Sequence, residues 1–332
     1  MKVNIIGCGL SGITAAVLLK EQGHQVEIFE MREHIGGNCY DYHQDGVTVH
    51  KYGAHLFHTK DEEVWNFLGR YTKFNNYVHR VRANTRLGLI SIPFNKKSAE
   101  QIGRDLSGPE IRELIYRDYS ERHWGIPWEE LPQSISGRVP EKRDNYDDRY
   151  FTDAYQGQPV NGYTEMFKAM LEGITVHLGA EEDAWRGRHC DLLIFTGKVD
   201  AYFKYKWGRL PYRSLRFEHF PAPKDPLFSF EKGSVINECN RKPYNRTMDN
   251  SVYLDEKVET TILTRDYPEE HDETNLPIYP KSFGHGRELY SERYKPAVAA
   301  ETDVLFLGRL ATYAYLDMWM AVKQVMVKLG QR

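Results

Sequence analysis

The chain has 332 residues, enough to bury a sizeable core, and 41% of them are hydrophobic. Its 44 basic and 47 acidic residues give a net charge of −3 without long runs of one sign, which argues against a nucleic-acid-binding or polybasic membrane surface. The four cysteines are widely spaced without a CxxC pair, and the apolar runs are too short for a membrane helix, so we expect a soluble cytoplasmic protein without structural zinc or disulfides.

The chain begins with the pattern of a dinucleotide-binding fold. Residues 2–6 predict a buried strand, the turn GCGLSG follows, and ITAAVLLKEQG has the period of a helix. A second strand, 25–30, ends at Glu30. In such a unit the glycines let the backbone approach a pyrophosphate, and the acid accepts a ribose hydroxyl. Glu30 would repel a 2′-phosphate, so FAD or NAD is preferred to NADP; a turn that merely packs helix on strand is the alternative.

A second glycine pair moves this interpretation toward FAD. Arg32 is followed by Ile35-Gly36-Gly37-Asn38. A flavin dinucleotide spans more than one nucleotide and needs such close backbone approach along its length. A simple Gly-Gly turn is the alternative.

The segment HKYGAHLFHT at 50–59 holds three histidines. A metal site is disfavoured because no carboxylate completes a ligand pattern. We expect His55 and His58 to tune protonation of a flavin ring, whereas a structural role is nearly as well supported for His50.

Later parts of the chain alternate between helical and strand patterns. Helical signals at 61–72 precede strands within 78–94, a helix over 98–123 that breaks near SGPE, and a strand-rich stretch to about 295. The segments 174–179, 191–197 and 303–308 resemble buried strands of the first domain, and an amphipathic helix is predicted over 317–330.

Four arginines stand beside proline, glycine or aromatic residues: Arg138, Arg213, Arg246 and Arg309. An arginine in such surroundings suits a fixed, bidentate phosphate contact. A solvated surface charge is the alternative for each of them.

Six motifs together resemble the UDP-galactopyranose mutase family: GCGLSG…FEMREHIGGN, HKYGAHLFHT, YSERHWG, DRYFTDAYQGQPVNGYT, PYRSLRFE and GRLATYAYLDM. The resemblance implies an α/β fold with a Rossmann-like FAD-binding domain, a small helical domain and a twisted antiparallel sheet domain. The expected FAD-binding domain comprises 1–75, 174–204 and 300–332; the reduced helical domain 96–136; and the substrate domain 76–95, 137–173 and 205–299.

The implied activity is an isomerase reaction that interconverts the pyranose and furanose forms of UDP-galactose. In this family, reduced FAD attacks the sugar through N5, UDP leaves, and a covalent flavin–sugar adduct allows the ring to open and reclose. No protein nucleophile is then required.

The resemblance also assigns residues. Arg138 and Arg246 would hold the diphosphate, and His55 and His58 are grouped with them as catalytic. The expected substrate contacts are Tyr116, Tyr119, Trp124, Tyr150, Arg213, Tyr279, Tyr315 and Asp317. The expected cofactor contacts are Gly7, Gly9, Leu10, Ser11, Gly12, Glu30, Arg32, Gly36, Gly37, Asn38, His55, Gly197, Gly308, Arg309, Asp317 and Met318.

The stretch between residues 94 and 119 is shorter than the usual helical insertion of bacterial members. The sequence therefore leaves open whether the protein forms a homodimer. The sequence also leaves open the sugar (galactose, arabinose or N-acetylgalactosamine) and the external reductant, NAD(P)H or reduced flavin. The alternatives are an FAD-dependent oxidoreductase of amine-oxidase type and a non-catalytic sugar-nucleotide binder.

Overall fold

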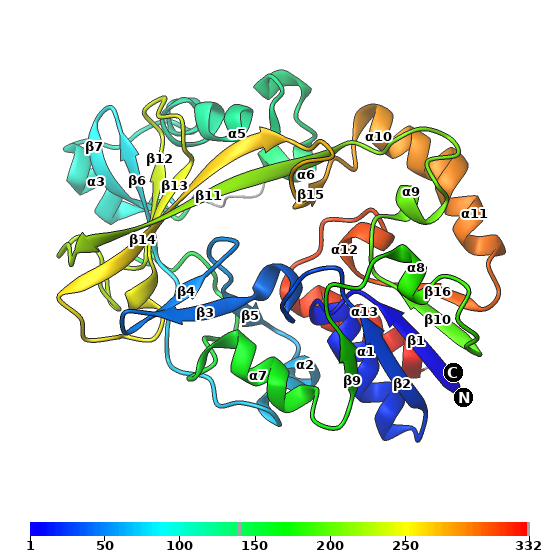
Figure 1. The fold of residues 1–332 in the computed structure, drawn as a ribbon. Coiled ribbons are helices and arrows are strands. Elements are labelled where there is room, and N and C mark those ends of the chain that lie inside the picture. The colour runs from blue at the N-terminus through cyan, green and yellow to red at the C-terminus, as the bar shows by residue number, and fades with distance from the viewer. Residues whose placement is uncertain (138–140, 331–332) are drawn as a thin grey trace.

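A five-stranded parallel sheet forms the lower right part of the molecule in Figure 1, where the computed structural model describes residues 1–137 and 141–330. Its strand order is β16-β10-β1-β2-β9, so the first strand lies at the centre. Val3 and Ile5 of β1 are fully buried because both faces of a parallel sheet are covered. The strands are β1 (Lys2–Ile6), β2 (Gln25–Phe29), β9 (Thr175–His177), β10 (Leu192–Phe195) and β16 (Val304–Phe306).

Two helices from opposite ends of the chain cover this sheet together. Helix α1 (Leu10–Glu21) begins inside the glycine motif and not after it, because Gly9 already has the extended backbone of an N-cap. Helix α13 (Met318–Gly330) confirms the predicted terminal helix, and its Val322 and Val325 are fully buried. The two helices share one hydrophobic core with the strands.

The second sheet is mixed and has seven strands in the order β15-β11-β14-β13-β12-β6-β7. Its long antiparallel pair β11–β14 crosses the upper part of Figure 1. The strands are β6 (Val81–Thr85), β7 (Gly88–Ile92), β11 (Tyr212–Pro223), β12 (Val235–Glu238), β13 (Arg246–Asp249), β14 (Thr260–Glu270) and β15 (Tyr279–Pro280).

The predicted helical stretch forms four short pieces against this second sheet. The break falls after Gly103, whose φ of +85° ends the first helix, and Ser107 starts the next with a capping box. Ile111 and Leu114 pack on the sheet with Ile90. The pieces are α3 (Lys96–Ile102), α4 (Gly108–Ile111), the π-turn η2 (Arg112–Tyr116) and α5 (Arg117–Trp124).

The remaining elements are shorter and lie between or beside the two sheets. They are η1 (Gly37–Cys39), β3 (Asp41–Gln44), β4 (Val47–His50), β5 (Phe57–Thr59), α2 (Glu62–Gly69), η3 (Trp128–Glu130), α6 (Gln133–Ser136), β8 (Tyr155–Gly157), α7 (Gly162–Met170), α8 (Glu182–Trp185), α9 (Val199–Tyr202), η4 (Asn250–Val252), α10 (Gly284–Leu289), η5 (Tyr290–Tyr294), α11 (Lys295–Ala300) and α12 (Gly308–Ala311).

The β3–β4 hairpin and helix α7 were not predicted from the sequence. Asp45 and Gly46 join the two hairpin strands with positive φ angles, and an Asp-Gly pair between alternating strands is a hairpin signal. Phe167 of α7 is buried in the core of the first sheet, although 137–173 was expected in the substrate domain. We propose the predicted three-part division with α7 moved to the first domain. No helix of the described residues is long and apolar enough to cross a membrane.

Candidate active site

The glycine turn between β1 and α1 leaves no room for a side chain at Gly7 or Gly12. A Cβ on Gly12 would lie 2.0 Å from the carbonyl oxygen of Gly7, and Gly7 itself has a φ of +98°. Gly9 caps α1 without a side-chain bond, and the first turn of the helix has no acidic residue. The positive end of a three-turn helix therefore faces this turn, as a pyrophosphate requires.

Glu30 ties this turn to the end of β2. Its carboxylate, 5% exposed, accepts the N–H of Cys8 at 2.7 Å on Oε2 and the N–H of Arg32 at 2.9 Å on Oε1. Nη2 of Arg32 donates to Oδ1 of Asn38 at 2.9 Å, while its Nη1 is buried without a partner in the described part of the chain. An orphaned buried donor is costly, so this geometry suits an anionic group beside Arg32.

The Gly36–Gly37 pair lies directly against the glycine turn between β1 and α1. The N–H of Gly36 donates to the carbonyl of Cys8 at 2.8 Å, and a Cβ on Gly37 would come within 2.8 Å of the Cα of Gly9. Gly308 approaches from the C-terminal part, where its Cβ would lie 2.9 Å from Oγ of Ser11. We call these residues the glycine cradle: Gly7, Gly9, Gly12, Gly36, Gly37 and Gly308. Its close backbone approaches fit a bound dinucleotide.

Four further predicted cofactor contacts lie near this cradle or its helices. Leu10 is buried in the core under α1, and Met318 also packs against that core, which supports helix packing for both. Gly197 follows β10, and Asp317 precedes α13 and accepts the N–H of Ala321 at 3.0 Å on its carbonyl. Contact of these residues with a cofactor stays a prediction.

His55 follows the hairpin, and two arginines of the site affect its pKa. Its Nδ1 is 2.9 Å from the carbonyl oxygen of Gly53, so this nitrogen donates. Burial, then His50, and more weakly Arg309 and Arg246, lower the pKa of His55 to about 3. The ring is therefore neutral at pH 7 and within electrostatic reach of both arginines.

The other two histidines of this segment have different surroundings. His50 is 4% exposed and stacks on Tyr253 with ring centroids 4.5 Å apart, a structural role. Nδ1 of His58 lies 2.7 Å from Oδ2 of Asp153, and its ring stacks on Phe151 at 3.6 Å. The sequence analysis did not single out Asp153.

Arg309 and two tyrosines converge at the start of α12. The guanidinium lies 5.4 Å from the ring centroid of Tyr279 and 5.1 Å from that of Tyr315, and the two rings stack 5.7 Å apart. Arg309 also donates to the carbonyls of Ile278 and Leu316 at 3.3 and 2.5 Å. These bonds fix the cation between two segments that are distant in the sequence.

Arg246 on β13 pairs with Asp266 on β14. Nε donates to Oδ2 of Asp266 at 2.5 Å, and Nη2 contacts the same oxygen. Although burial favours the neutral form, Asp266, Tyr119 and Tyr279 raise the pKa of Arg246 well above its ordinary value, so it stays charged. We call Arg246, Arg309, Tyr119, Tyr279 and Tyr315 the arginine–tyrosine cluster.

His123 lies inside this cluster, and the sequence analysis did not identify it. Its ring centroid is 6.1 Å from that of Tyr119 and 5.1 Å from that of Tyr279. Burial and then Arg246, Arg213 and Arg122 lower its pKa to about 3, and Nδ1 is buried without a hydrogen-bond partner among residues 1–137 and 141–330. Its position between the predicted ligands Tyr119 and Trp124 on helix α5 was the available signal.

Arg213 holds the end of α5. Its Nε and Nη2 donate to the carbonyls of His123 and Arg122 at 2.8 and 2.9 Å, and Nη1 pairs with Glu270 at 2.5 Å. The side chain is 4% exposed. Arg213 therefore positions the helix that carries His123, and a direct substrate contact stays a prediction.

The remaining predicted substrate residues border the cluster. Trp124 is buried and lies 6.1 Å from Tyr279 between ring centroids. Tyr116 ends the π-turn and packs in the core of the second sheet with Tyr150, which is close enough to affect the pKa of both Tyr116 and Tyr119. Arg138 lies outside the described residues.

The site thus combines a glycine cradle for a dinucleotide with two partly buried cations among aromatic rings. The described residues contain no group of three or more His, Cys, Asp or Glu that could hold a metal. This fold and site define a Rossmann-type dinucleotide-binding protein with a second sheet above the cofactor region.

Comparison with known proteins gives the family. The UDP-galactopyranose mutase family model matches residues 114–315, and an NAD(P)-binding Rossmann-like domain matches residues 5–71. The dTDP-fucopyranose mutase of Escherichia coli is 33% identical over 97% of this chain and 96% of its own length. The probable UDP-galactopyranose mutase of Klebsiella pneumoniae is 33% identical over 98% and 92%. The chain belongs to the UDP-galactopyranose mutase family, whose named enzymes are isomerases.

Solved structures agree on the fold. A crystal structure of reduced UDP-galactopyranose mutase superposes with a TM-score of 0.77 at 17% identity, covering 100% of this chain and 96% of that one. A putrescine oxidase variant has a TM-score of 0.63 at 13% identity. Membership of the family implies a flavin cofactor.

Proposed function

We propose that this protein interconverts the pyranose and furanose forms of a nucleotide-linked sugar, of the UDP-galactose type, on reduced FAD. The observation that supports this most directly is the pair of fixed arginines: Arg309 packs on Tyr279 and Tyr315 next to Gly308 of the glycine cradle, and Arg246 is held by Asp266. Arg246 lies on β13 of the second sheet and Arg309 on α12, which follows β16 of the first sheet, so the two cations come from the two halves of the site.

In this proposal Arg246 binds the diphosphate of the substrate. Asp266 holds Nε and Nη2, and within the described residues Nη1 makes no hydrogen bond, which leaves it for a phosphate oxygen. A fixed cation that need not reorganise stabilises the negative charge of a departing nucleoside diphosphate. Arg138 would contribute a second cation by its resemblance to the family.

Four other side chains complete the proposed site. Tyr119 offers an aromatic face for the base, and Tyr279 and Tyr315 offer hydroxyls for the phosphates or the sugar. The hydrogen bond to Gly53 fixes the orientation of the neutral His55 ring, which in this proposal lies near the flavin. When bound, reduced flavin supplies a nucleophilic nitrogen for the anomeric carbon, so no serine or cysteine nucleophile is needed.

Purified holoenzyme reduced with dithionite should convert UDP-galactofuranose to UDP-galactopyranose, and oxidised holoenzyme should not. dTDP-fucofuranose is the comparison substrate, because a relative with equal identity is named for dTDP-fucose. Turnover independent of the flavin redox state would contradict the proposal. Oxygen consumption in proportion to product would favour an oxidase instead.

A further inference from the structure

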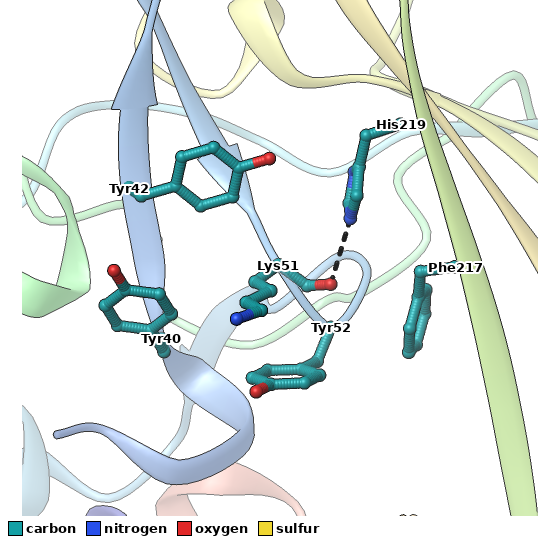
Figure 2. A pocket seen from close by; sticks show the side chains of 6 residues that line it. All are labelled: Tyr40, Tyr42, Lys51, Tyr52, Phe217 and His219. Atoms are coloured by element: carbon teal, nitrogen blue, oxygen red, sulfur yellow. Dashed lines mark hydrogen bonds between the residues drawn. The ribbon is translucent and has the colours of Figure 1, made fainter. Parts of the chain in front are cut away.

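A pocket of about 510 Å³ opens between the β3–β4 hairpin and strand β11, and none of its residues had a predicted role. Figure 2 shows the hairpin side chains facing two side chains of β11 across it. Its volume falls within the range of small-molecule sites, roughly 300 to 1,000 Å³. The lining residues are Tyr40, Tyr42, Lys51, Tyr52, Phe217 and His219, and we call this the hairpin pocket.

Aromatic rings form most of its wall. Tyr52 and Phe217 meet edge to face with centroids 6.3 Å apart, and Tyr42 meets His219 in the same way at 6.3 Å. Nε2 of His219 donates to the carbonyl of Lys51 at 3.1 Å, which fixes the strand to the hairpin (Figure 2). The rings therefore form a preformed surface on which a planar group can stack.

The charge of the pocket is positive. The Lys51 ammonium lies 5.7 Å from the ring centroids of Tyr40 and Tyr52, near the outer limit of a cation–π contact, and has no carboxylate partner in the described part of the chain. A second cation, the Arg32 guanidinium, lies 4.7 Å from the ring centroid of Tyr52. No acidic residue lines the pocket. An exposed cation without a counter-ion beside stacked rings suits an anionic ligand.

We propose that the hairpin pocket is a second nucleotide site, which takes a planar heteroaromatic ring on its aromatic wall and a phosphate on Lys51. It shares no lining residue with the glycine cradle or the arginine–tyrosine cluster. Arg32 stands between pocket and cradle, since it bonds Asn38 on one side and covers Tyr52 on the other.

The pocket also borders the segment that carries His55. A Cβ on Gly53 would lie 2.7 Å from the Phe217 ring, so this ring packs directly against the residue that orients His55. A ligand stacked in the pocket would therefore touch the segment that leads to the proposed reaction site, without entering that site.

The test uses holoenzyme saturated with UDP, so that the substrate site is filled, and titrates NADPH, FMN and pyrophosphate by calorimetry. NADPH and FMN distinguish a dinucleotide ligand from a mononucleotide ligand, and pyrophosphate measures binding of the anionic group alone. Lys51→Glu should weaken binding of the nucleotide about tenfold or more, as expected for loss of a charge-assisted contact. Tyr42→Leu, which keeps apolar bulk but removes the stacking face, should weaken it as well.

Lys206→Glu is the matched control, because Lys206 is also exposed and lies 4.9 Å from a tryptophan ring outside the pocket. It should bind all probes as the wild type does. Flavin content and isomerase turnover of Lys51→Glu should also stay unchanged.

The proposal is overturned if neither nucleotide binds more tightly than about 1 mM, if Lys51→Glu has no effect, or if Lys51→Glu loses flavin. Pyrophosphate binding as tightly as the nucleotides, with Tyr42→Leu unchanged, would also overturn the aromatic part. The binding and flavin-content measurements need no turnover, so they do not depend on the proposed isomerase reaction.

Discussion

Arg246 and Asp266 are direct cross-strand partners, and the carboxylate of Asp266 holds Nε and Nη2 of the guanidinium from one side. Asp266 is fully buried, so it exerts its charge in surroundings with little water. The pair fixes both the charge and the direction of Arg246. Its Nη1 makes no hydrogen bond among the described residues and stays available as a donor.

Replacing Arg246 by alanine should lower kcat about 10²- to 10³-fold, the usual cost of losing one preorganised charge-stabilising donor. Arg246→Lys keeps the charge without the fork and should retain part of the activity. Steady-state kinetics with reduced holoenzyme checks both variants. Arg216→Ala removes an exposed arginine of β11, a strand of the same sheet, and should leave kcat unchanged; a wild-type kcat in Arg246→Ala would contradict the assigned role.

Gly37→Ala should abolish most flavin binding. Gly37 has a φ of +57°, and the new Cβ would lie 2.8 Å from the Cα of Gly9, a backbone atom that can move only by opening the cradle. The measurement is the flavin-to-protein absorbance ratio after purification. Gly103→Ala is the control: its φ is +85°, but its Cβ would meet no atom within 4 Å, so it should lose about 1 kcal/mol of stability and keep its flavin. Equal flavin content in both variants would show that the contact is unimportant.

The glycine cradle was predictable from sequence because its chemistry is local. Gly7, Gly9, Gly12 and Glu30 belong to one strand–turn–helix–strand unit, and their spacing carries the geometry. The Gly36–Gly37 pair was also recognisable, although its contact with Gly9 depends on a chain reversal that the sequence pattern does not specify.

The other half of the site depends on long-range strand pairing. Asp266 reaches Arg246 only because β13 and β14 pair in one register, and no local pattern marks that register. His123 becomes part of the cluster because Arg213, distant in the sequence, binds the end of its helix. The predicted roles of Arg246, Tyr279 and Tyr315 came from resemblance to a family, which already includes such tertiary information.

Tyr315→Phe should impair substrate use more than flavin retention. The ring that stacks on Tyr279 is kept, so only the hydroxyl is lost, and kcat/KM should fall about tenfold. Tyr313→Phe is a close control, because the Tyr313 hydroxyl donates to the carbonyls of Pro211 and Lys281. It should cost about 1 to 3 kcal/mol of stability with little change in kcat/KM. Loss of flavin without loss of kcat/KM in Tyr315→Phe would show that the placement is wrong.

Stability should fall in acid partly through His50. Burial lowers its pKa from 6.5 to about 3, so the unfolded chain binds a proton on this ring at a higher pH than the folded protein does. The contribution is complete above pH 6.5 and is lost progressively as the pH falls toward 3. Between pH 7.5 and 5 it amounts to about 2 kcal/mol.

His50→Asn keeps an acceptor for the N–H of His55 but cannot titrate, so its free energy of unfolding should change about 2 kcal/mol less over that interval than the wild type's. Denaturant unfolding at the two pH values gives the change in the free energy of unfolding with pH for each protein. A loss of stability that is equal at both pH values does not alter this change. His43→Asn, an exposed residue of the same hairpin, should follow the wild-type pH dependence. If His50→Asn also follows it, protonation of a ring other than His50 causes the acid loss.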